Sequence, residues 1–338
     1  MRLLSWLFGK RDKPNPPAVM IKDAPQPIVE LSKTFLCIDA IEWHGLFKKS
    51  PNRKWAVSWR DSTPDGSRGG HRESGEGRYL LVNLSTGAVA AQGSLPRPNQ
   101  GQVADNGTFS IEDWHFGSNL SGTFHVFSAD GTPIVLRTFT ANILESGLSK
   151  NGKLAYCITA NSPTEDAGKL TLFDLTTGHV LFSVRPRRFG ADKIEFDEKH
   201  CQLVFKVSGG GEYRYGADGT ILDEHTADDA FLNSSDYSAV ILSAESMLKG
   251  DSTLLTPEKG QEILEALIRA RRIGADMNPA WKPTALKVQG LAHEALSQVT
   301  EAIACYEEAL SLNPKIGVKR KLDLLRKRAG MDTRKTAE

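Results

Sequence analysis

The sequence contains few cysteines and no long apolar run. Its cysteines form no Cys-x-x-Cys pair and lie far apart, at Cys37, Cys157, Cys201 and Cys305. Disulfide scaffolds are dense in cysteine and zinc sites have closely spaced pairs, so we predict free thiols in a reducing compartment. No segment reaches the roughly 20 apolar residues that a membrane-spanning helix needs. These absences predict a cytoplasmic protein.

An excess of charge and the common catalytic motifs are also absent. The 338 residues include 42 Lys and Arg against 41 Asp and Glu, a formal net charge of +1, which does not favour a nucleic-acid partner. The sequence has no Gly-x-Ser-x-Gly motif, no P-loop and no His-Glu-x-x-His motif, and its eight histidines have no metal-ligand spacing. The glycines at 209–211 are interpreted as an inter-strand loop. We therefore predict no cofactor, no metal and no catalytic residues.

Residues 1–27 predict an N-terminal arm followed by a proline-rich linker. The arm combines basic residues at 10, 11 and 13 with an apolar cluster, formed by Leu3, Leu4, Trp6, Leu7 and Phe8. This pattern is typical of a weak interfacial membrane anchor or of a partner-binding helix. The alternative is an arm that docks on its own domain or is disordered. Five prolines within 13–27 predict an extended linker.

Four segments of the sequence share one strand–turn–strand motif. They occupy 79–92, 124–136, 170–182 and 213–224, and each contains a Thr-Gly or Asp-Gly turn between two apolar runs. Alternation with period two predicts half-buried strands, and glycine supplies the positive φ of a tight hairpin turn. The predicted turn glycines are Gly87, Gly131, Gly178 and Gly219.

A second motif, a polar turn followed by a β-rich run, recurs with the same spacing as the first motif. It begins at Ser50, Ala104, Ser149 and Phe196, with a looser fifth copy at Asn233. Two strand pairs in about 44 residues are typical of one four-stranded propeller blade. We predict about five blades between 28 and 250, with a strand from 27–43 closing the ring against 233–248. An open stack of hairpins is the alternative.

These units resemble WD40-like propeller blades. The best match is the unit at 149–181, through Ser149, Asn151, Gly152, Leu154, Ala155, Phe173, Asp174, Leu175, Thr177, Gly178 and Val180. No unit has the Trp-Asp or the Gly-His pair of that family, so the hydrogen bonds of those residues are not carried over. The resemblance implies a propeller that presents loops and a rim to protein partners.

A 17-residue insert at 61–77 interrupts the first unit and contains no apolar residue. It predicts a flexible loop between two strands. Long loops on a rigid scaffold often carry function, which makes Arg68, His71 and Arg72 candidates for partner contact. An inert insertion is the alternative.

Helical signals replace strand alternation after about residue 250. Thr256 and Pro257 predict an N-cap and a first helical residue, and Gly274 predicts the end of that helix. The next two helices resemble a tetratricopeptide repeat, through Gly290, Ala302, Tyr306, Ala309 and Pro314. A third helix has apolar residues on one face and basic residues on the others. We interpret it as a polar cap, with a nucleic-acid-binding helix as the alternative. The predicted helical domain spans 256–330, and 331–338 is a predicted disordered tail.

Three polar residues in the first helix of that pair predict a binding face. Lys287, Gln289 and His293 stand where the repeat pattern tolerates larger apolar residues. We interpret them as a solvated concave groove that takes a segment of a partner. The alternative is that the propeller covers this face.

Together these patterns predict a mainly β protein with a C-terminal α tail, comprising a small propeller-like domain and tetratricopeptide-like helices. The predicted function is a non-catalytic scaffold that binds a protein partner. A specific version is a bacterial accessory, inhibitor or immunity-type subunit paired with a partner encoded beside it. The alternatives are a propeller enzyme with a site in its central channel and a membrane-peripheral adaptor anchored by residues 1–13.

Overall fold

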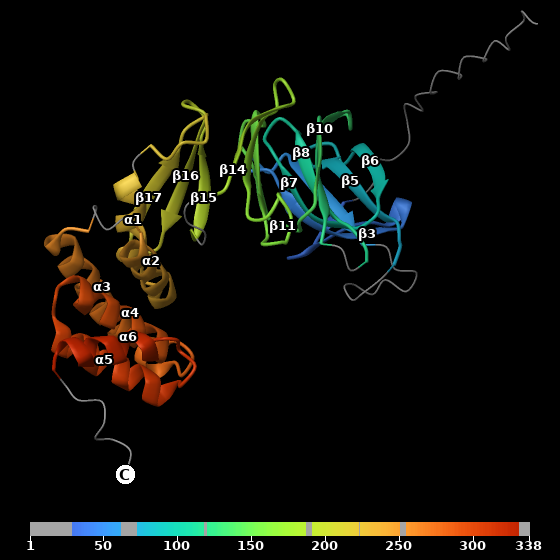
Figure 1. Cartoon of the computed structure of the whole chain (residues 1–338). Helices are drawn as coiled ribbons and strands as arrows, with labels where there is room; N and C mark the ends of the chain where they lie inside the picture. Colours follow the sequence, from blue (N-terminus) through green and yellow to red (C-terminus); the bar gives the residue numbers. More distant parts are fainter. Residues whose placement is uncertain are drawn as a thin grey trace, which may run out of the picture.

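The computed structural model describes residues 29–61, 73–117, 120–186, 191–222, 224–250 and 255–330. In these ranges the chain forms antiparallel β-sheets first and six α-helices afterwards (Figure 1). The prediction of a mainly β protein with a C-terminal helical part is confirmed.

The strands form four sheets in chain order. Sheet 1 contains β1 (Glu30–Leu31), β2 (Phe35–Ile38), β3 (Trp43–Lys49), β4 (Trp55–Arg60), β5 (Gly77–Asn83) and β6 (Val89–Leu95). Sheet 2 contains β7 (Pro98–Val103), β8 (Phe109–Trp114), β9 (Gly122–Phe127) and β10 (Pro133–Phe139). Sheet 3 contains β11 (Ile143–Leu148), β12 (Leu154–Thr159), β13 (Leu170–Asp174) and β14 (His179–Val184). Sheet 4 contains β15 (Lys193–Asp197), β16 (Gln202–Val207) and β17 (Gly211–Tyr215).

Each of the two repeated motifs corresponds to one kind of hairpin. The Thr-Gly and Asp-Gly turns join β5 to β6, β9 to β10 and β13 to β14, and the last one follows β17. Their glycines have φ values of 73°, 86°, 74° and 81°, for Gly87, Gly131, Gly178 and Gly219 respectively. The second motif forms the hairpins β3–β4, β7–β8, β11–β12 and β15–β16.

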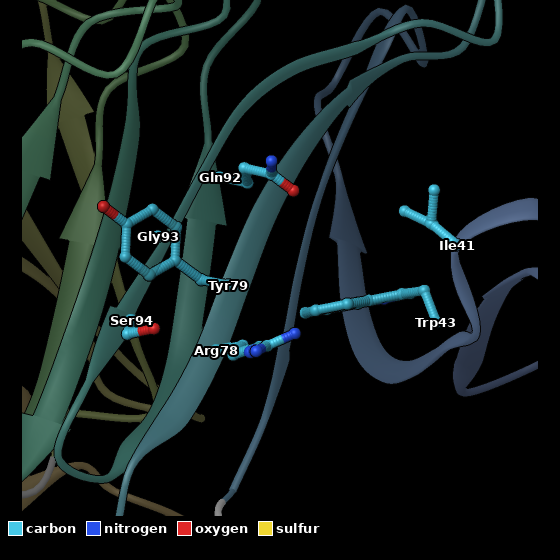
Figure 2. Close-up of a pocket in the computed structure, with 7 residues that line it drawn as sticks. All are labelled: Ile41, Trp43, Arg78, Tyr79, Gln92, Gly93 and Ser94. Atoms are coloured by element: carbon cyan, nitrogen blue, oxygen red, sulfur yellow. The ribbon is translucent and has the colours of Figure 1, made fainter.

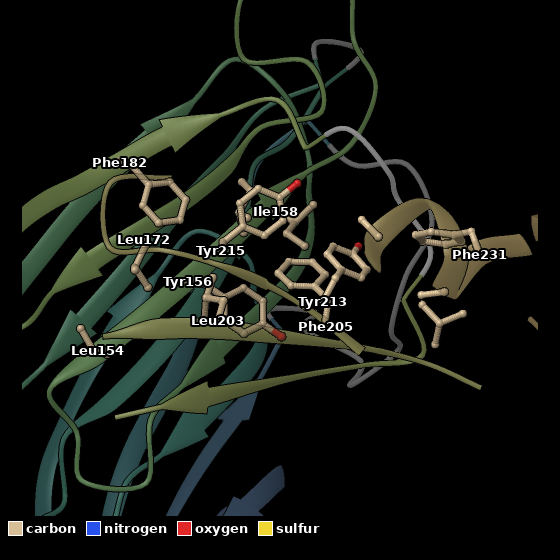
Figure 3. Close-up of a cluster of buried hydrophobic side chains, with 14 residues drawn as sticks. Leu154, Tyr156, Ile158, Leu172, Phe182, Leu203, Phe205, Tyr213, Tyr215 and Phe231 are labelled. Atoms are coloured by element: carbon tan, nitrogen blue, oxygen red, sulfur yellow. The ribbon is translucent and has the colours of Figure 1, made fainter. Parts of the chain in front are cut away.

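The sheets pack face to face because alternate side chains of their strands point to opposite faces. In β8, Phe109 and Ile111 belong to the core shared with sheet 1, while Phe124 of β9 packs with Phe173 in the core shared with sheet 3. A third core, rich in aromatic side chains, joins sheets 3 and 4 to the first helix (Figure 3). Apolar contacts therefore link each sheet to the next one along the chain.

The predicted fifth blade and the predicted ring closure are wrong. The segment after Asn233 is a helix, and β2 pairs with β3 inside sheet 1 instead of closing a ring. Sheet 4 has three strands and one isolated bridge, between Tyr215 and Ile221, where a fourth strand was expected. No core cluster of the described residues joins sheet 4 back to sheet 1. The described sheets form an open array, as the alternative of an open stack proposed.

The helical part begins at Glu224 and not at 256. Its helices are α1 (Glu224–Leu232), α2 (Tyr237–Lys249), α3 (Pro257–Ile273), α4 (Lys282–Ala295), α5 (Val299–Leu312) and α6 (Lys319–Arg328). Helix α2 begins after Asp236, whose side chain accepts a hydrogen bond from the N–H of Ser238 at 2.8 Å. Its buried residues Val240, Ile241 and Ala244 follow helical spacing and pack against α3 and α4. The buried residues of this segment thus follow helical spacing and not strand alternation.

The later helices have defined ends, and two of them form a close-packed hairpin. Thr256 accepts a hydrogen bond from the N–H of Lys259 at the start of α3, which ends at Gly274. Helices α4 and α5 form a hairpin in which the fully buried ring of Tyr306 lies against Gly290. Ala302 and Ala309 are also fully buried, and Pro314 follows the end of α5. A Cβ at position 290 would overlap the Tyr306 ring, so glycine is needed here for close packing.

Candidate interaction surface

The hairpin turns of the second motif lie side by side in a row. We call residues 50–54, 104–108, 149–153 and 197–201 the turn row. The N–H of Asn52 donates to Oδ1 of Asp105 at 2.6 Å, and the N–H of Asp105 donates to the carbonyl of Lys150 at 2.9 Å. The N–H of Asn151 donates to Oε1 of Glu198, also at 2.9 Å. Hydrogen bonds therefore connect the turns of all four sheets in sequence.

Sheet 4 has one apolar face and one charged face. Residues such as Phe196, Phe205 and Tyr213 face sheet 3 or α1 and are buried or half-buried. The strand period of two places charged residues on the opposite face, and these are Lys193, Glu195, Asp197, Lys206, Glu212 and Arg214. Sheets 2 and 3, in contrast, have central strands β8, β9 and β12 that are buried along nearly their whole length. Sheet 4 therefore has the one-sided burial expected of the last sheet in the array.

Ion pairs across the strands organise this charged face. Glu195 accepts from Lys193 at 2.6 Å and from Lys206 at 2.7 Å. The hydrogen bonds from these two lysines lower the pKa of Glu195 to about 2. Arg214 contacts Glu212 at 2.8 Å and Asp197 at 3.2 Å. A hydrogen bond from His200 lowers the pKa of Asp197, so both carboxylates stay ionised at neutral pH.

A groove of about 980 Å³ runs between this charged face and the turn row. We call it the end groove. Its lining includes the charged side chains of β15–β17 and of the turns, together with four apolar residues, Pro51, Leu148, Phe196 and Val204. Lys150 and Lys199 in the turn row add positive charge at its rim. This combination of paired charges and apolar residues suits contact with a polypeptide segment.

This charged face was not among the predictions from the sequence, although the sequence contains a signal for it. In the segment 193–197 the residues read Lys-Ile-Glu-Phe-Asp, and in 212–215 they read Glu-Tyr-Arg-Tyr. Charged and apolar residues alternate there, whereas β12 reads Leu-Ala-Tyr-Cys-Ile-Thr. An alternation of charges predicts a solvated face, and continuous apolar character predicts burial on both faces.

The three residues of the predicted helical groove are not a solvated face. Lys287 contacts Glu245 of α2 at 2.8 Å. Gln289 and His293 are buried, the former accepting from Nη1 of Arg271 in α3 at 2.8 Å. The prediction of a solvated concave face is therefore wrong. Helices α2 and α3 provide these contacts, and not the sheets as the alternative proposed.

The other predicted contact residues fall outside the described ranges. This applies to the insert residues Arg68, His71 and Arg72 and to the arm residues Leu3, Leu4, Trp6, Leu7 and Phe8. None of the described helices is both long and apolar enough to cross a bilayer. Within the described ranges, no three His, Cys, Asp or Glu side chains gather as they would around a metal ion. The described sheets also form no closed ring, so they do not enclose the central channel that the propeller-enzyme alternative requires.

Comparison with known proteins identifies no family for this chain. No protein-family model matches it, and no curated protein matches it. Among solved structures, the crystal structure of the Chaetomium thermophilum Sqt1 matches with a TM-score of 0.34 and 12% identity. The match covers 52% of this chain and 45% of that one. A likeness at this level carries no functional argument, and no comparison supports the tetratricopeptide resemblance.

Proposed function

We propose that this chain is a non-catalytic module that binds a protein partner through the end groove and the adjoining turn row. The observation that carries the proposal is the open charged face of sheet 4, which borders a groove of about 980 Å³. The central strands of sheets 2 and 3 are covered on both sides, and sheet 4 differs from them in having a charged face open to solvent.

The chemistry of the groove favours a polypeptide over a small ion. Three carboxylates of the charged face each have a cationic partner, namely Glu195, Asp197 and Glu212. A small cation therefore finds little uncompensated negative charge on this face. An extended segment can instead lay apolar side chains on Pro51 and Leu148 and place acidic side chains near Lys150 and Lys199.

The test uses charge reversal at the rim of the groove. We expect Lys150→Glu with Lys199→Glu to abolish stoichiometric recovery of a partner when the full chain is purified from its native host. Both lysines are exposed, so the melting temperature of the double variant should stay close to that of the wild type. The recovered partner is then measured against both proteins in a direct binding assay.

A matched control reverses two lysines away from the groove. Lys33 lies in the turn between β1 and β2, and Lys48 lies in β3; both are exposed and neither is part of the groove lining. Lys33→Glu with Lys48→Glu changes the net charge by the same amount. Equal loss of partner in both double variants, or full binding by the groove variant, contradicts the proposal.

A dedicated accessory or inhibitor subunit in the cytoplasm is the specific form of this proposal. The four cysteines are free thiols, which supports a reducing compartment. If the recovered partner is encoded beside this gene, the specific form gains support; an unlinked, secreted partner argues against it.

A further inference from the structure

Two arginines lie directly opposite each other on the outer face of sheet 1. The register of β4 and β5 pairs Arg60 with Arg78. Directly opposed residues of an antiparallel pair share one face, with their Cβ atoms about 5 Å apart, and like charges there destabilise the sheet. Neither arginine forms an ion pair with any described residue. The sheet therefore holds two adjacent positive charges without a protein counter-charge among the residues that the structure describes.

One of the two guanidinium groups has a fixed position. Cζ of Arg60 lies 5.0 Å from the ring centroid of Trp43, and Nη1 of Arg60 donates to the carbonyl of Glu42 at 3.3 Å. Nε1 of Trp43 in turn donates to Oγ of Ser58 at 2.9 Å, which fixes the indole ring. Stacking on a held ring limits the conformational freedom that Arg60 would lose on binding a ligand.

The second arginine lines a pocket of about 410 Å³ on the same side of the sheet. Figure 2 shows Arg78 extending toward Trp43, with Gln92 and Ser94 on the neighbouring strand. Ile41, which is 46% exposed, contributes an apolar edge. No Asp or Glu is among the lining residues. The pocket therefore combines a positive charge, neutral polar groups and one apolar edge.

We propose that Arg78 and Arg60 form a binding site for a small ligand that carries a phosphate monoester. Arg78 contacts the phosphate in the pocket, and Arg60 supplies the second positive charge from the adjacent strand. A phosphate monoester has a charge of about −1.5 to −2 at pH 7, which matches two guanidinium groups, and its oxygens accept bidentate hydrogen bonds. A volume of about 410 Å³ exceeds a single phosphate group and leaves room for an organic part beside Ile41 and Gln92. This site lies on sheet 1 and does not depend on the end groove.

The test titrates the full chain with phenyl phosphate and with inorganic phosphate by calorimetry and by thermal melting. We expect both probes to raise the melting temperature in a saturable way, and sodium chloride at equal ionic strength to leave it unchanged. Arg78→Gln should raise the apparent Kd by about tenfold to a hundredfold, because a charge-assisted hydrogen bond is lost. Arg60→Gln should raise it by a smaller factor.

A matched control is Arg137→Gln, because Arg137 is exposed and also stacks on an aromatic ring, at 5.4 Å from the Phe139 centroid. This variant should bind both probes as the wild type does. The anion-free protein at low salt gives a second readout, in which Arg78→Gln should melt at or above the wild-type temperature because a like-charge contact is removed. Equal weakening by Arg137→Gln, a lowered melting temperature of anion-free Arg78→Gln, or binding of succinate in place of the phosphates would overturn the proposal.

Discussion

Gly178 lies against the carbonyl oxygen of Ile134, a residue of the preceding sheet. A Cβ atom at Gly178 would stand only 2.9 Å from that oxygen. The same relationship recurs along the array, where Gly131 faces Ala91 and Gly219 faces Phe182. The outer hairpin turn of each of sheets 2, 3 and 4 thus closes on the outer strand of the sheet before it. A side chain at these positions would separate neighbouring sheets.

Replacing this glycine should destabilise the sheet array. We expect Gly178→Val to lower the free energy of unfolding by about 1–3 kcal/mol, because a β-branched residue is strained at a φ of 74° and meets the Ile134 carbonyl. Gly117 provides the control, since it has a φ of 84° and a Cβ atom there would meet no neighbouring atom within 4 Å. Denaturant unfolding of both valine variants separates the two effects. An equal loss at Gly117 would show that the contact with Ile134 contributes nothing.

Glu112 should make stability depend on pH. It is buried between sheets 2 and 3, where it accepts from Ser146 at 2.6 Å and from Trp114 at 3.2 Å. Burial raises the pKa of Glu112 above its ordinary value of 4.5. The folded protein therefore holds this proton more tightly than the unfolded chain does. The stability that this group contributes is complete below pH 4.5 and is lost as the pH rises through the raised pKa.

The variant Glu112→Gln removes this titration. We expect its free energy of unfolding to increase relative to the wild type as the pH rises above 4.5, measured by denaturant unfolding at several pH values. Glu195→Gln is a control of opposite sign, because the pKa of Glu195 is lowered to about 2. Its stability should fall relative to the wild type between about pH 2 and pH 4.5. A constant difference between Glu112→Gln and the wild type would contradict the assigned direction.

The hydrogen bonds of the turn row should contribute to stability. Asp105→Ala removes the acceptor of the Asn52 N–H bond and should lower the free energy of unfolding by about 0.5–1.5 kcal/mol. Asp105→Asn keeps an oxygen at that place and should recover most of the loss. Equilibrium unfolding of the three proteins provides the measurement. If the asparagine variant is as unstable as the alanine variant, the contact depends on charge and not on the acceptor.

The helical hairpin should not tolerate a side chain at Gly290. Gly290→Val would push against the buried Tyr306 ring, and overpacking of this kind costs about 1–3 kcal/mol. Loss of far-ultraviolet helical signal on heating reports the effect. A double variant that also carries Tyr306→Ala should cost less than the sum of the two single variants. Strict additivity would mean that the two positions do not contact each other.

The parts of the fold that depend on neighbouring residues were predictable. The turn glycines follow from local chain geometry, and the Thr256 cap from its own first turn. Helix α2 was not predicted because its segment opens with a polar turn and a β-branched run, as the strands do. Its burial against α3 and α4 decides the outcome, and that contact is not visible in the sequence.

The site residues were harder to predict because long-range pairing determines their surroundings. The opposition of Arg60 and Arg78 depends on the register of two strands that are separated by the insert. Lys287 looks available in the sequence, yet Glu245 on another helix pairs with it. The charges of sheet 4 are the exception, since their alternation along β15 is a local pattern.

The order of the sheet contacts has a consequence for synthesis on the ribosome. A closed ring in which the first strand completes the last blade can form its final contact only after the whole domain has been made. Here β1 and β2 belong to sheet 1, and each later sheet packs on the one made just before it. We expect the nascent chain to bury the core between sheets 1 and 2 while sheets 3 and 4 are still being translated. An incomplete chain would then expose the apolar face of only its most recently made sheet. The charged face of sheet 4 leaves no further apolar sheet face to cover at that end of the array.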